Sequence, residues 1–285
     1  MALGAQEPGK DDTTHVTRAA CNAGLWCAVA LLTCAFAAQA DTRAPRIAII
    51  IDDIGYSLTT GARVIALPGP VTLAVLPFTR NAAALAARAR DAGKDVILHQ
   101  PMQAQHDRRQ IPGTLTTTMD RALVRKALRK SLSRVPHAIG VSNHTGSLLT
   151  TSPRSMAWIM EEVHAHGLFF LDSRTTHETV ARESARAAGV PSVKRDVFLD
   201  HVVEPRAIAR EFDRALRLAR RQGFAVLIGH PHDETLSLLE RELPSLASRG
   251  FQLVPVRALV DVPVRHQIAL ARLETPGFLR IAHVR

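Results

Sequence analysis

The sequence predicts one α/β domain of seven or eight strands, arranged as a closed or partly closed barrel, with an open doubly wound sheet as the alternative. From Arg43 onward, apolar runs alternate with amphipathic stretches, which is the pattern of repeated β–α units. The first run, 47–51, shows no polar alternation and is typical of a central parallel strand covered on both faces. No Gly-x-Gly-x-x-Gly or Walker-type loop follows it, which argues against nucleotide binding.

The other strands are expected where apolar runs meet turn residues. The run 71–76 ends at Pro77, and the run 95–98 ends at His99. The same pattern recurs at 139–142, 168–171, 224–228 and 251–255, and in a less regular form at 193–200. A long polar segment, 100–118, contains the turn Pro112-Gly113, and we expect it to fold over the site.

The helices are placed by their caps and by the glycines that follow them. Asn81 begins a helix that ends before Gly93, Asp120 begins the next, and Ser152-Pro153 is a strong helix start. We expect helices at 58–67, 81–92, 120–134, 153–166, 177–188, 204–222 and 235–247.

The first forty residues are set apart from this pattern. Arg18 precedes an apolar run, 24–38, and Ala38-Gln39-Ala40 fits the small-x-small rule for a secretory signal. An uncleaved N-terminal anchor is the alternative, because the leading segment is long and acidic, and it would be the chain's one contact with a membrane. We therefore expect a signal peptide or anchor at 1–40, a domain at 41–262, a tail at 263–285, and a periplasmic or secreted location.

All three cysteines lie in the leading segment, so the mature chain would contain neither disulfides nor thiolate chemistry. Removing residues 1–40 takes away two basic and three acidic residues and leaves a net charge of +11. A basic surface favours anionic glycans, lipid headgroups or nucleic acid. With one tyrosine and two tryptophans there is no aromatic interleaving for base stacking, so we expect no nucleic-acid partner.

Polar residues follow the apolar runs directly, at the strand ends where α/β folds build their sites. Any single one could be a helix cap, but three histidines and several carboxylates at one end of a sheet favour a functional site. These residues are Asp52, Asp53, His99, Asn143, His144, Asp172 and His230.

Two histidines and one carboxylate are a recognised ligand set for catalytic zinc and similar divalent ions. A second carboxylate could act as base, and a further histidine could protonate the leaving group. The adjacent pair Asp52 and Asp53 suits this division, because alternating side chains of a strand point in different directions.

The sequence resembles the divergent polysaccharide deacetylase family, within the NodB-like carbohydrate esterases, over roughly residues 45–260. The resemblance rests on five motifs in matching order: Ile50-Ile51-Asp52-Asp53-Ile54-Gly55, Leu98-His99-Gln100-Pro101-Met102, Ser142-Asn143-His144-Thr145-Gly146-Ser147, Leu171-Asp172-Ser173-Arg174-Thr175 and Ile228-Gly229-His230-Pro231. It implies an irregular (β/α) barrel that removes acetyl groups from an acetylated glycan or peptidoglycan with a divalent metal, zinc being the expected ion.

The resemblance also implies roles for individual residues. Asp52 would be the catalytic base and His230 the general acid, oriented by Asp172 or Asp196. Asp53, His99 and His144 would be the metal ligands. We expect Asn143, Ser147, Arg174 and Asp196 to contribute to substrate binding.

Two departures from the better-known deacetylases leave alternatives open. Those enzymes carry two metal histidines four residues apart, whereas Gln103 and Leu148 stand four residues after His99 and His144. The Arg-x-Pro-Tyr motif is also missing. The alternatives are a non-catalytic envelope protein that binds a glycan or a protein partner, and a phosphoesterase in which Arg174 meets the phosphate.

Overall fold

The computed structural model describes residues 44–106 and 110–261. The signal or anchor predicted at 1–40 and the tail predicted at 263–285 lie outside the described residues. The strands are β1 (Arg46–Ile54), β2 (Thr72–Val75), β3 (Val96–Met102), β4 (Gly140–Thr145), β5 (Phe169–Asp172), β6 (Ser192–Lys194), β7 (Val197–Phe198), β8 (Phe224–Gly229) and β9 (Gln252–Leu253). The α-helices are α2 (Leu58–Ala66), α3 (Ala82–Asp91), α4 (Arg121–Leu132), α5 (Pro153–Ala165), α6 (Ala181–Ala187), α7 (Pro205–Gln222) and α8 (Asp233–Glu242).

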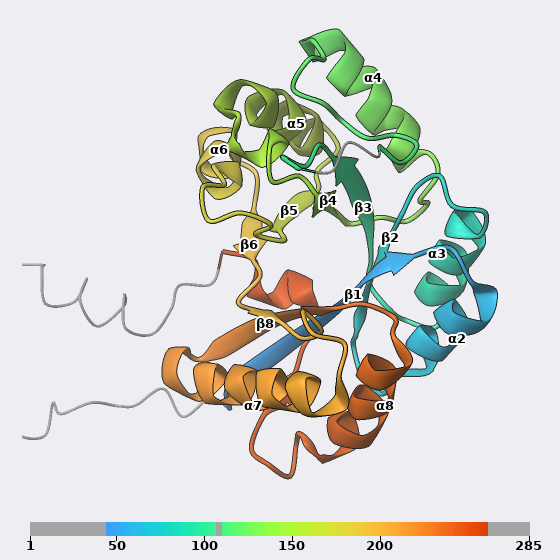
Figure 1. The fold of residues 1–285 in the computed structure, drawn as a ribbon, viewed down its shortest axis with the longest axis vertical. Helices are drawn as coiled ribbons and strands as arrows, with labels where there is room; N and C mark the ends of the chain where they lie inside the picture. Colours follow the sequence, from blue (N-terminus) through green and yellow to red (C-terminus); the bar gives the residue numbers. More distant parts are fainter. Residues whose placement is uncertain (1–43, 107–109, 262–285) are drawn as a thin grey trace, which may run out of the picture. The chain divides into compact units, whose positions relative to one another are not determined.

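The strands form one curled parallel sheet in the order β6-β5-β4-β3-β2-β1-β8-β7, and β9 pairs with the start of β1 (Figure 1). Strands β1 to β6 lie side by side in chain order, as in a singly wound barrel, whereas a doubly wound sheet would reverse direction at its centre. The predicted partly closed barrel is therefore confirmed.

The barrel is open between its two edge strands, β6 and β7, which do not pair. The predicted strand 193–200 is divided between these two edges, and residues Arg195 and Asp196 cross the opening. The backbone N–H of Arg195 donates to Asp172 O on one edge at 2.9 Å, and that of Asp196 donates to Val226 O on the other at 2.9 Å. This crossing explains why the segment did not read as a regular strand.

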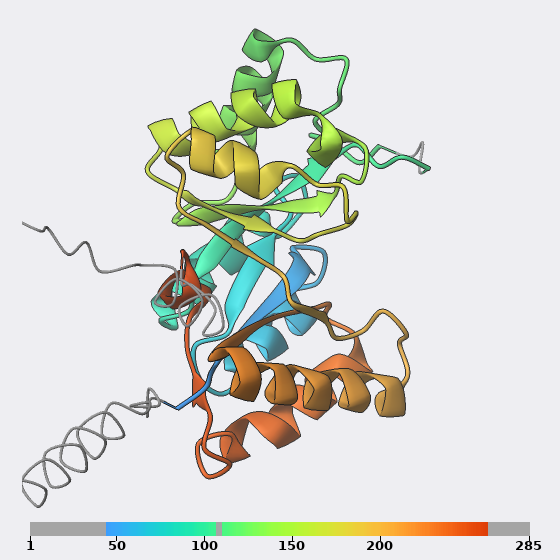
Figure 2. The same ribbon diagram turned by 90° about the vertical axis from the view of Figure 1, so that its left-hand side faces the viewer.

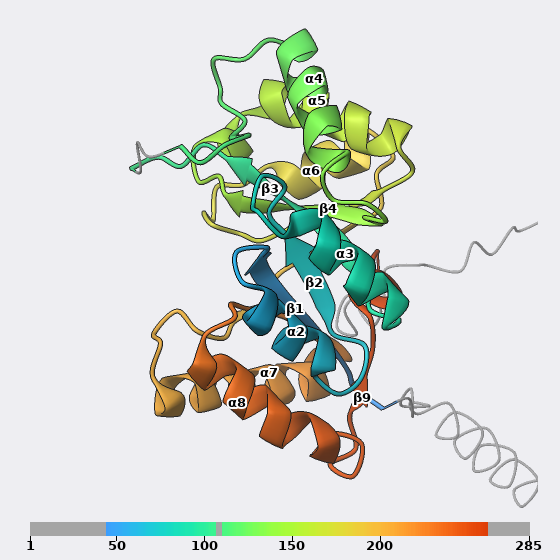
Figure 3. The same cartoon turned by 90° about the vertical axis from the view of Figure 1, so that its right-hand side faces the viewer.

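The strands β1, β2, β3, β5 and β8 bury both faces almost throughout, which is why their sequences lack alternation. In β1, Ile47, Ile49 and Ile51 pack outward in the larger core with the helices, whereas Ala48 and Ile50 pack inside the barrel. Figure 3 shows α2 and α3 over β1 and β2, and Figure 2 shows α7 and α8 on one side of the strands and α4 to α6 on the other. The alternation decides which side chains enter the barrel.

One end of the barrel is covered by the short 3₁₀ helix η3 (Val256–Leu259). Its Val256 and Leu259 are buried in the inner core. Hydrogen bonds join this segment to the first residues of two strands, from Arg46 Nη1 to Ala258 O at 3.2 Å and from Val256 N to Thr72 Oγ1 at 3.5 Å. The amino ends of the strands are therefore covered, and the site is built at the opposite, carboxyl ends.

Three expectations need correction. The helix predicted at 177–188 begins only at Ala181, because Val180 N donates instead to Thr150 O and Thr179 Oγ1 accepts from Ala181 N. Strands β1, β3 and β4 continue past their apolar runs through the polar residues. Segment 100–118 begins inside β3, its Leu115 pairs with Met102 of that strand, and none of its described residues lines the cleft around His99 and His230.

Within the described residues, no helix is both long enough and apolar enough to cross a bilayer.

Candidate active site

The site follows from the inward alternation of four strands. Ala48 and Ile50 of β1 lead to Asp52, Ile97 of β3 leads to His99, and Val226 and Ile228 of β8 lead to His230. His144 lies two residues after Ser142 on β4, and Ser142 bonds to the inward-facing His99. The side chains at the carboxyl ends of β1, β3, β4 and β8 therefore meet above the inner core.

Asp53 would point outward if β1 were regular, but the strand is irregular there. Its register against β2 shifts between Ile51 and Ile54, and Asp53 has a left-handed φ of 58°. The bulge brings both carboxylates to the same imidazole, since His99 Nε2 lies 3.5 Å from Asp52 Oδ2 and 3.4 Å from Asp53 Oδ1. The expectation that the two aspartates point in different directions is therefore wrong at this bulge.

Left-handed backbone recurs around this end of the barrel. Thr145 after His144 has φ 54°, and Arg174 after β5 has φ 49°. Such conformations cost about 1 kcal/mol or more in residues other than glycine, and they persist where the surrounding structure enforces them. Three such residues, Asp53, Thr145 and Arg174, lie at the carboxyl ends of the strands, so the backbone there is held in conformations that ordinary strand ends do not need.

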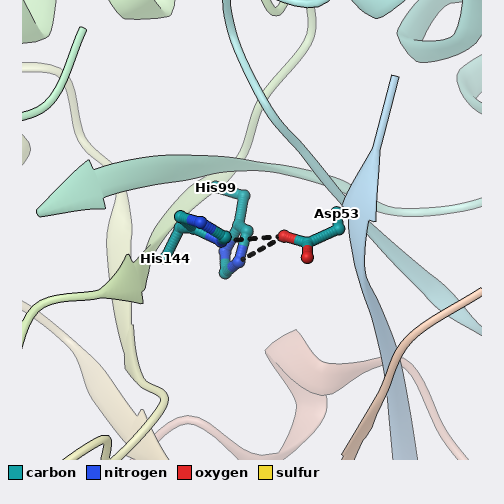
Figure 4. A group of neighbouring side chains, drawn as sticks. All are labelled: Asp53, His99 and His144. Atoms are coloured by element: carbon teal, nitrogen blue, oxygen red, sulfur yellow. Dashed lines mark ion pairs between the residues drawn. The ribbon is translucent and has the colours of Figure 1, made fainter. Parts of the chain in front are cut away.

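Asp53, His99 and His144 form a compact ligand set, in which one atom from each residue lies within 4.8 Å of the others. His144 Nδ1 lies 2.8 Å from Asp53 Oδ1 (Figure 4). Even so, Asp53 Oδ1 is buried without a hydrogen bond of acceptable geometry. A buried carboxylate oxygen with ring nitrogens at 2.8 and 3.4 Å, neither in good hydrogen-bond geometry, fits a shared cation, so these residues suit the divalent ion that the resemblance implies.

The charge of Asp53 agrees with this arrangement. Burial alone would raise the pKa of its carboxyl, but His144 and His99 hold that pKa well below its usual range. His99 is itself oriented from behind, because its Nδ1 lies 2.8 Å from Ser142 Oγ. A ligand histidine usually has its second nitrogen fixed in this way.

Asp52 lies deeper than its neighbour, with 2% of its surface exposed. Its Oδ1 is buried without a hydrogen bond in the described structure. Burial raises the pKa of this carboxyl, while the nearby His99 and His230 oppose the shift. A carboxylate with a raised pKa and a free oxygen beside a candidate metal site is suited to accept a proton.

His230 is held by Asp200, which sequence reasoning missed. His230 Nδ1 lies 2.9 Å from Asp200 Oδ1, and the backbone N–H of His230 donates to Asp200 Oδ2 at 2.5 Å. His230 Nε2 is thereby directed toward Asp53, at 3.9 Å from its Oδ2. Burial would lower the pKa of His230, but Asp200, Asp52 and Asp53 outweigh it and raise that pKa to about 9.

The predicted partners of His230 are both wrong. Asp172 accepts from Arg174 N at 2.8 Å and from Thr179 Oγ1 at 3.2 Å, and it lies on the outward side of β5. Asp196 accepts from Val226 N at 2.9 Å in the crossing between the sheet edges. Burial raises the pKa of both carboxyls, and neither is within ion-pairing distance of His230.

A cleft of about 430 Å³ lies over the site, with Asp52, His99, His144 and His230 in its lining. Of the residues predicted to bind substrate, Asn143 and Arg174 line this cleft. The Asn143 side chain already hydrogen-bonds to the protein backbone, since its Oδ1 accepts from Ser173 N at 2.9 Å and its Nδ2 donates to Thr145 O at 2.7 Å.

The other two residues predicted to bind substrate, Ser147 and Asp196, do not line the cleft. Ser147 Oγ instead accepts from the backbone N–H of Gln105 at 2.9 Å and so anchors the segment after β3.

The sequence does contain a signal for Asp200, namely its position directly after an apolar run. Asp200 follows the apolar Val197–Leu199 directly, just as Asp52 follows the run 47–51, but in the irregular segment 193–200 the sequence analysis chose Asp196 instead. Arg195, Phe198 and His201 also line the cleft and were not predicted, since nothing in the sequence shows that the chain crosses the barrel opening there.

Comparisons with known proteins agree with this architecture. The family model described as divergent polysaccharide deacetylase matches residues 49–260. The uncharacterized protein YibQ of Escherichia coli K12 is 34% identical over 220 residues, covering 77% of this chain and 69% of YibQ.

Two solved structures share the fold. The structure of an uncharacterized protein from Agrobacterium tumefaciens C58 superposes with a TM-score of 0.74 at 26% identity, covering 78% of this chain and 92% of that one. A mutant with restored activity of a carbohydrate esterase family 4 pseudoenzyme from Bacillus anthracis has a TM-score of 0.50 at 12% identity. The superposition covers 76% of this chain and 67% of the mutant's chain. At that identity the similarity shows the fold alone.

Proposed function

Because the chain belongs to the divergent polysaccharide deacetylase family, we propose that it is an exported, metal-dependent hydrolase that removes acetyl groups from a polysaccharide or peptidoglycan fragment. The observation that carries this proposal is the convergence of Asp53, His99 and His144 beside two further groups suited to proton transfer, Asp52 and His230. Export rests on the leader predicted at 1–40 and implies a periplasmic or secreted enzyme.

Asp53, His99 and His144 would hold a divalent cation, for which zinc is our proposal because two imidazoles and a carboxylate suit it. The ion would supply Lewis acidity at the acetyl carbonyl. Ser142 would fix the ring of His99 through the 2.8 Å contact at Nδ1.

The proton transfers fall to two residues of the chain. Asp52, through its unbonded Oδ1, accepts a proton from the water that attacks the acetyl carbon. When the tetrahedral intermediate collapses, the C–N or C–O bond to the sugar breaks and His230 Nε2 gives its proton to the leaving atom. The products are acetate and the free amine or hydroxyl. Asp200 keeps His230 protonated and directs Nε2 into the cleft.

The proposal is tested by acetate release from acetylated glycans, with the purified protein before and after chelation and re-addition of zinc. We expect chelation to abolish release and zinc to restore it, and we expect Asp52→Asn to lower kcat by about 10²-fold or more while metal content stays unchanged. A protein that retains no metal, or whose acetate release survives both chelation and Asp52→Asn, would refute the mechanism.

A non-catalytic envelope protein that binds a glycan or a protein partner is the second candidate. It is favoured by the absence of a second histidine after the first, since the corresponding Gln103 uses its side-chain oxygen to accept from Thr117 N at 2.9 Å. The family 4 pseudoenzyme noted above shows that a protein of this fold can lose activity. If Asp52→Asn preserves the cellular role while Arg174→Gln abolishes it, binding is favoured over chemistry.

A further inference from the structure

A second cleft adjoins the central one along the barrel opening. The second cleft, also about 430 Å³, lies between the crossing residues and the start of α7. The two share Arg195, Phe198 and His201 in their linings. We call the combined hollow the arginine trough, because Arg174, Arg195, Arg210 and Arg214 also line it.

Arg195 forms the middle of the trough and is held rigidly. Its Nε donates to Ser173 O at 2.6 Å and its Nη2 donates to Arg174 O at 2.8 Å. Its guanidinium also lies 5.0 Å from the centre of the Phe198 ring. The cation is therefore fixed by backbone carbonyls and an aromatic ring, none of which carries a negative charge.

The trough holds more positive charge than negative. Within the described part of the chain, no carboxylate lies within ion-pairing distance of Arg174, Arg195 or Arg210. The second cleft contains one acidic side chain, Glu211, and it is paired with Arg214 at 2.6 Å. Asp52 is the acidic residue in the lining of the central cleft, and it lies at the reaction centre.

The positive charges also crowd one another. Burial lowers the pKa of the Arg195 guanidinium and the like charge of Arg174 lowers it further, while the carboxylates of Asp172 and Asp52 oppose the shift without outweighing it. A ligand anion placed between them would relieve this repulsion. Guanidinium groups bind carboxylate and phosphate oxygens through paired hydrogen bonds, which gives the trough a defined preference.

From the shared lining of the two clefts and their positive charge we infer that the arginine trough binds an anionic stretch of the glycan, with carboxylate or phosphate groups on the sugars next to the acetylated unit. The inference rests on the proposed function, because that function places the acetylated sugar of the glycan in the central cleft. It adds that the preferred substrate is an acidic polymer, so a neutral acetylated chain would be bound more weakly.

Three probes of one length test the inference: chitopentaose, chitopentaose oxidised to carboxylates at C6, and chitopentaose phosphorylated at C6. Binding is measured by calorimetry with the purified full-length protein, and acetate release is measured in parallel. We expect at least one charged probe to bind about tenfold more tightly than the neutral one, with the preference weakening at high salt. The stronger of the two charged probes identifies the anion.

The variants Arg174→Gln and Arg210→Gln remove charge at either end of the trough without removing the carbonyl that holds Arg195. Each should lower affinity for the preferred charged probe about five- to tenfold, and Arg210→Gln, which lies outside the central cleft, should leave affinity for chitopentaose unchanged. Arg88→Gln is the matched control, because Arg88 is an exposed arginine on α3 that lines neither cleft.

The calorimetric measurement of binding does not depend on whether the protein releases acetate. Charge-selective binding that the trough variants abolish supports the inference even if no acetate is released, in which case the proposed hydrolase function fails by itself. Equal affinity for the three probes, or an equal loss in Arg88→Gln, overturns the inference even if the protein deacetylates all of them.

Discussion

Two groups of one aspartate and two histidines lie at the open end of the barrel, and they differ in how their carboxylates are satisfied. In the first, Asp53 with His99 and His144, the buried Asp53 Oδ1 lacks a hydrogen bond although a ring nitrogen lies 2.8 Å away. In the second, Asp200 with His230 and His232, the Asp200 carboxylate contacts His230 N, His230 Nδ1 and Thr235 Oγ1.

This difference separates a cation site from a proton-transfer pair of the same composition. An unsatisfied buried oxygen needs a partner, whereas a carboxylate with three hydrogen bonds already has its partners. His232, the third member of the second group, is exposed at the start of α8. We therefore assign the metal to the first group and the orientation of His230 to the second.

The largest expected effect is on metal content. Asp53→Asn removes the charged ligand but keeps the shape of the side chain and its tolerance of left-handed backbone, so we expect bound zinc to be lost and acetate release to fall about 10³-fold or more. Asp200→Asn, the matched change in the second group, should keep its zinc. Elemental analysis of the two purified variants measures the contrast. Loss of zinc only in Asp200→Asn would reverse the assignment, and loss in both variants would contradict the separation of the two groups.

The next effect is on the pH profile. The folded-state pKa of His230 is raised to about 9, so His230 is protonated at neutral pH and its acid function is lost as pH rises through that value. In Asp200→Asn the uncharged amide no longer supports the imidazolium, so this pKa falls toward the usual 6.5.

The alkaline limb of kcat/KM should therefore move to lower pH by at least about one unit in Asp200→Asn. The acidic limb, assigned to Asp52, should move much less. An unchanged alkaline limb in this variant would show that His230 is not the proton donor.

The smallest effect concerns the support of a single ligand. Ser142→Ala removes the hydroxyl 2.8 Å from His99 Nδ1, and we expect zinc affinity to fall about tenfold with little change in the thermal midpoint. A competition titration with a chromogenic chelator measures it. The control is Thr150→Ala. It also removes a buried hydroxyl, but that hydroxyl donates to the backbone carbonyl of Gly146 and not to a ligand histidine, so zinc affinity should stay unchanged.

Much of the fold could be predicted from the sequence, because strand and helix runs are separated by strong turn residues. The site was predicted from polar residues at strand ends, and five of the six side chains that the structure brings together were chosen for that reason: Asp52, Asp53, His99, His144 and His230, but not Asp200. Asp172 was a false choice because both faces of β5 are buried, so its sequence holds no alternation to show that Asp172 points away from the cleft.

The bulge at Asp53 could not be predicted either. It depends on how β1 pairs with β2, and only the left-handed backbone of Asp53 brings the two carboxylates to one imidazole. The link between His230 and Asp200 depends in the same way on β7 lying next to β8, thirty residues away in the chain. Contacts between strands decide these details, and a local pattern does not record them.

The most direct test of the account is anomalous diffraction at the zinc edge from crystals of the purified protein grown with zinc. We predict a single strong peak within bonding distance of Asp53, His99 and His144, with His230 still bonded to Asp200. A peak held instead by Asp200, His230 and His232, or no peak near either group at saturating zinc, would contradict it.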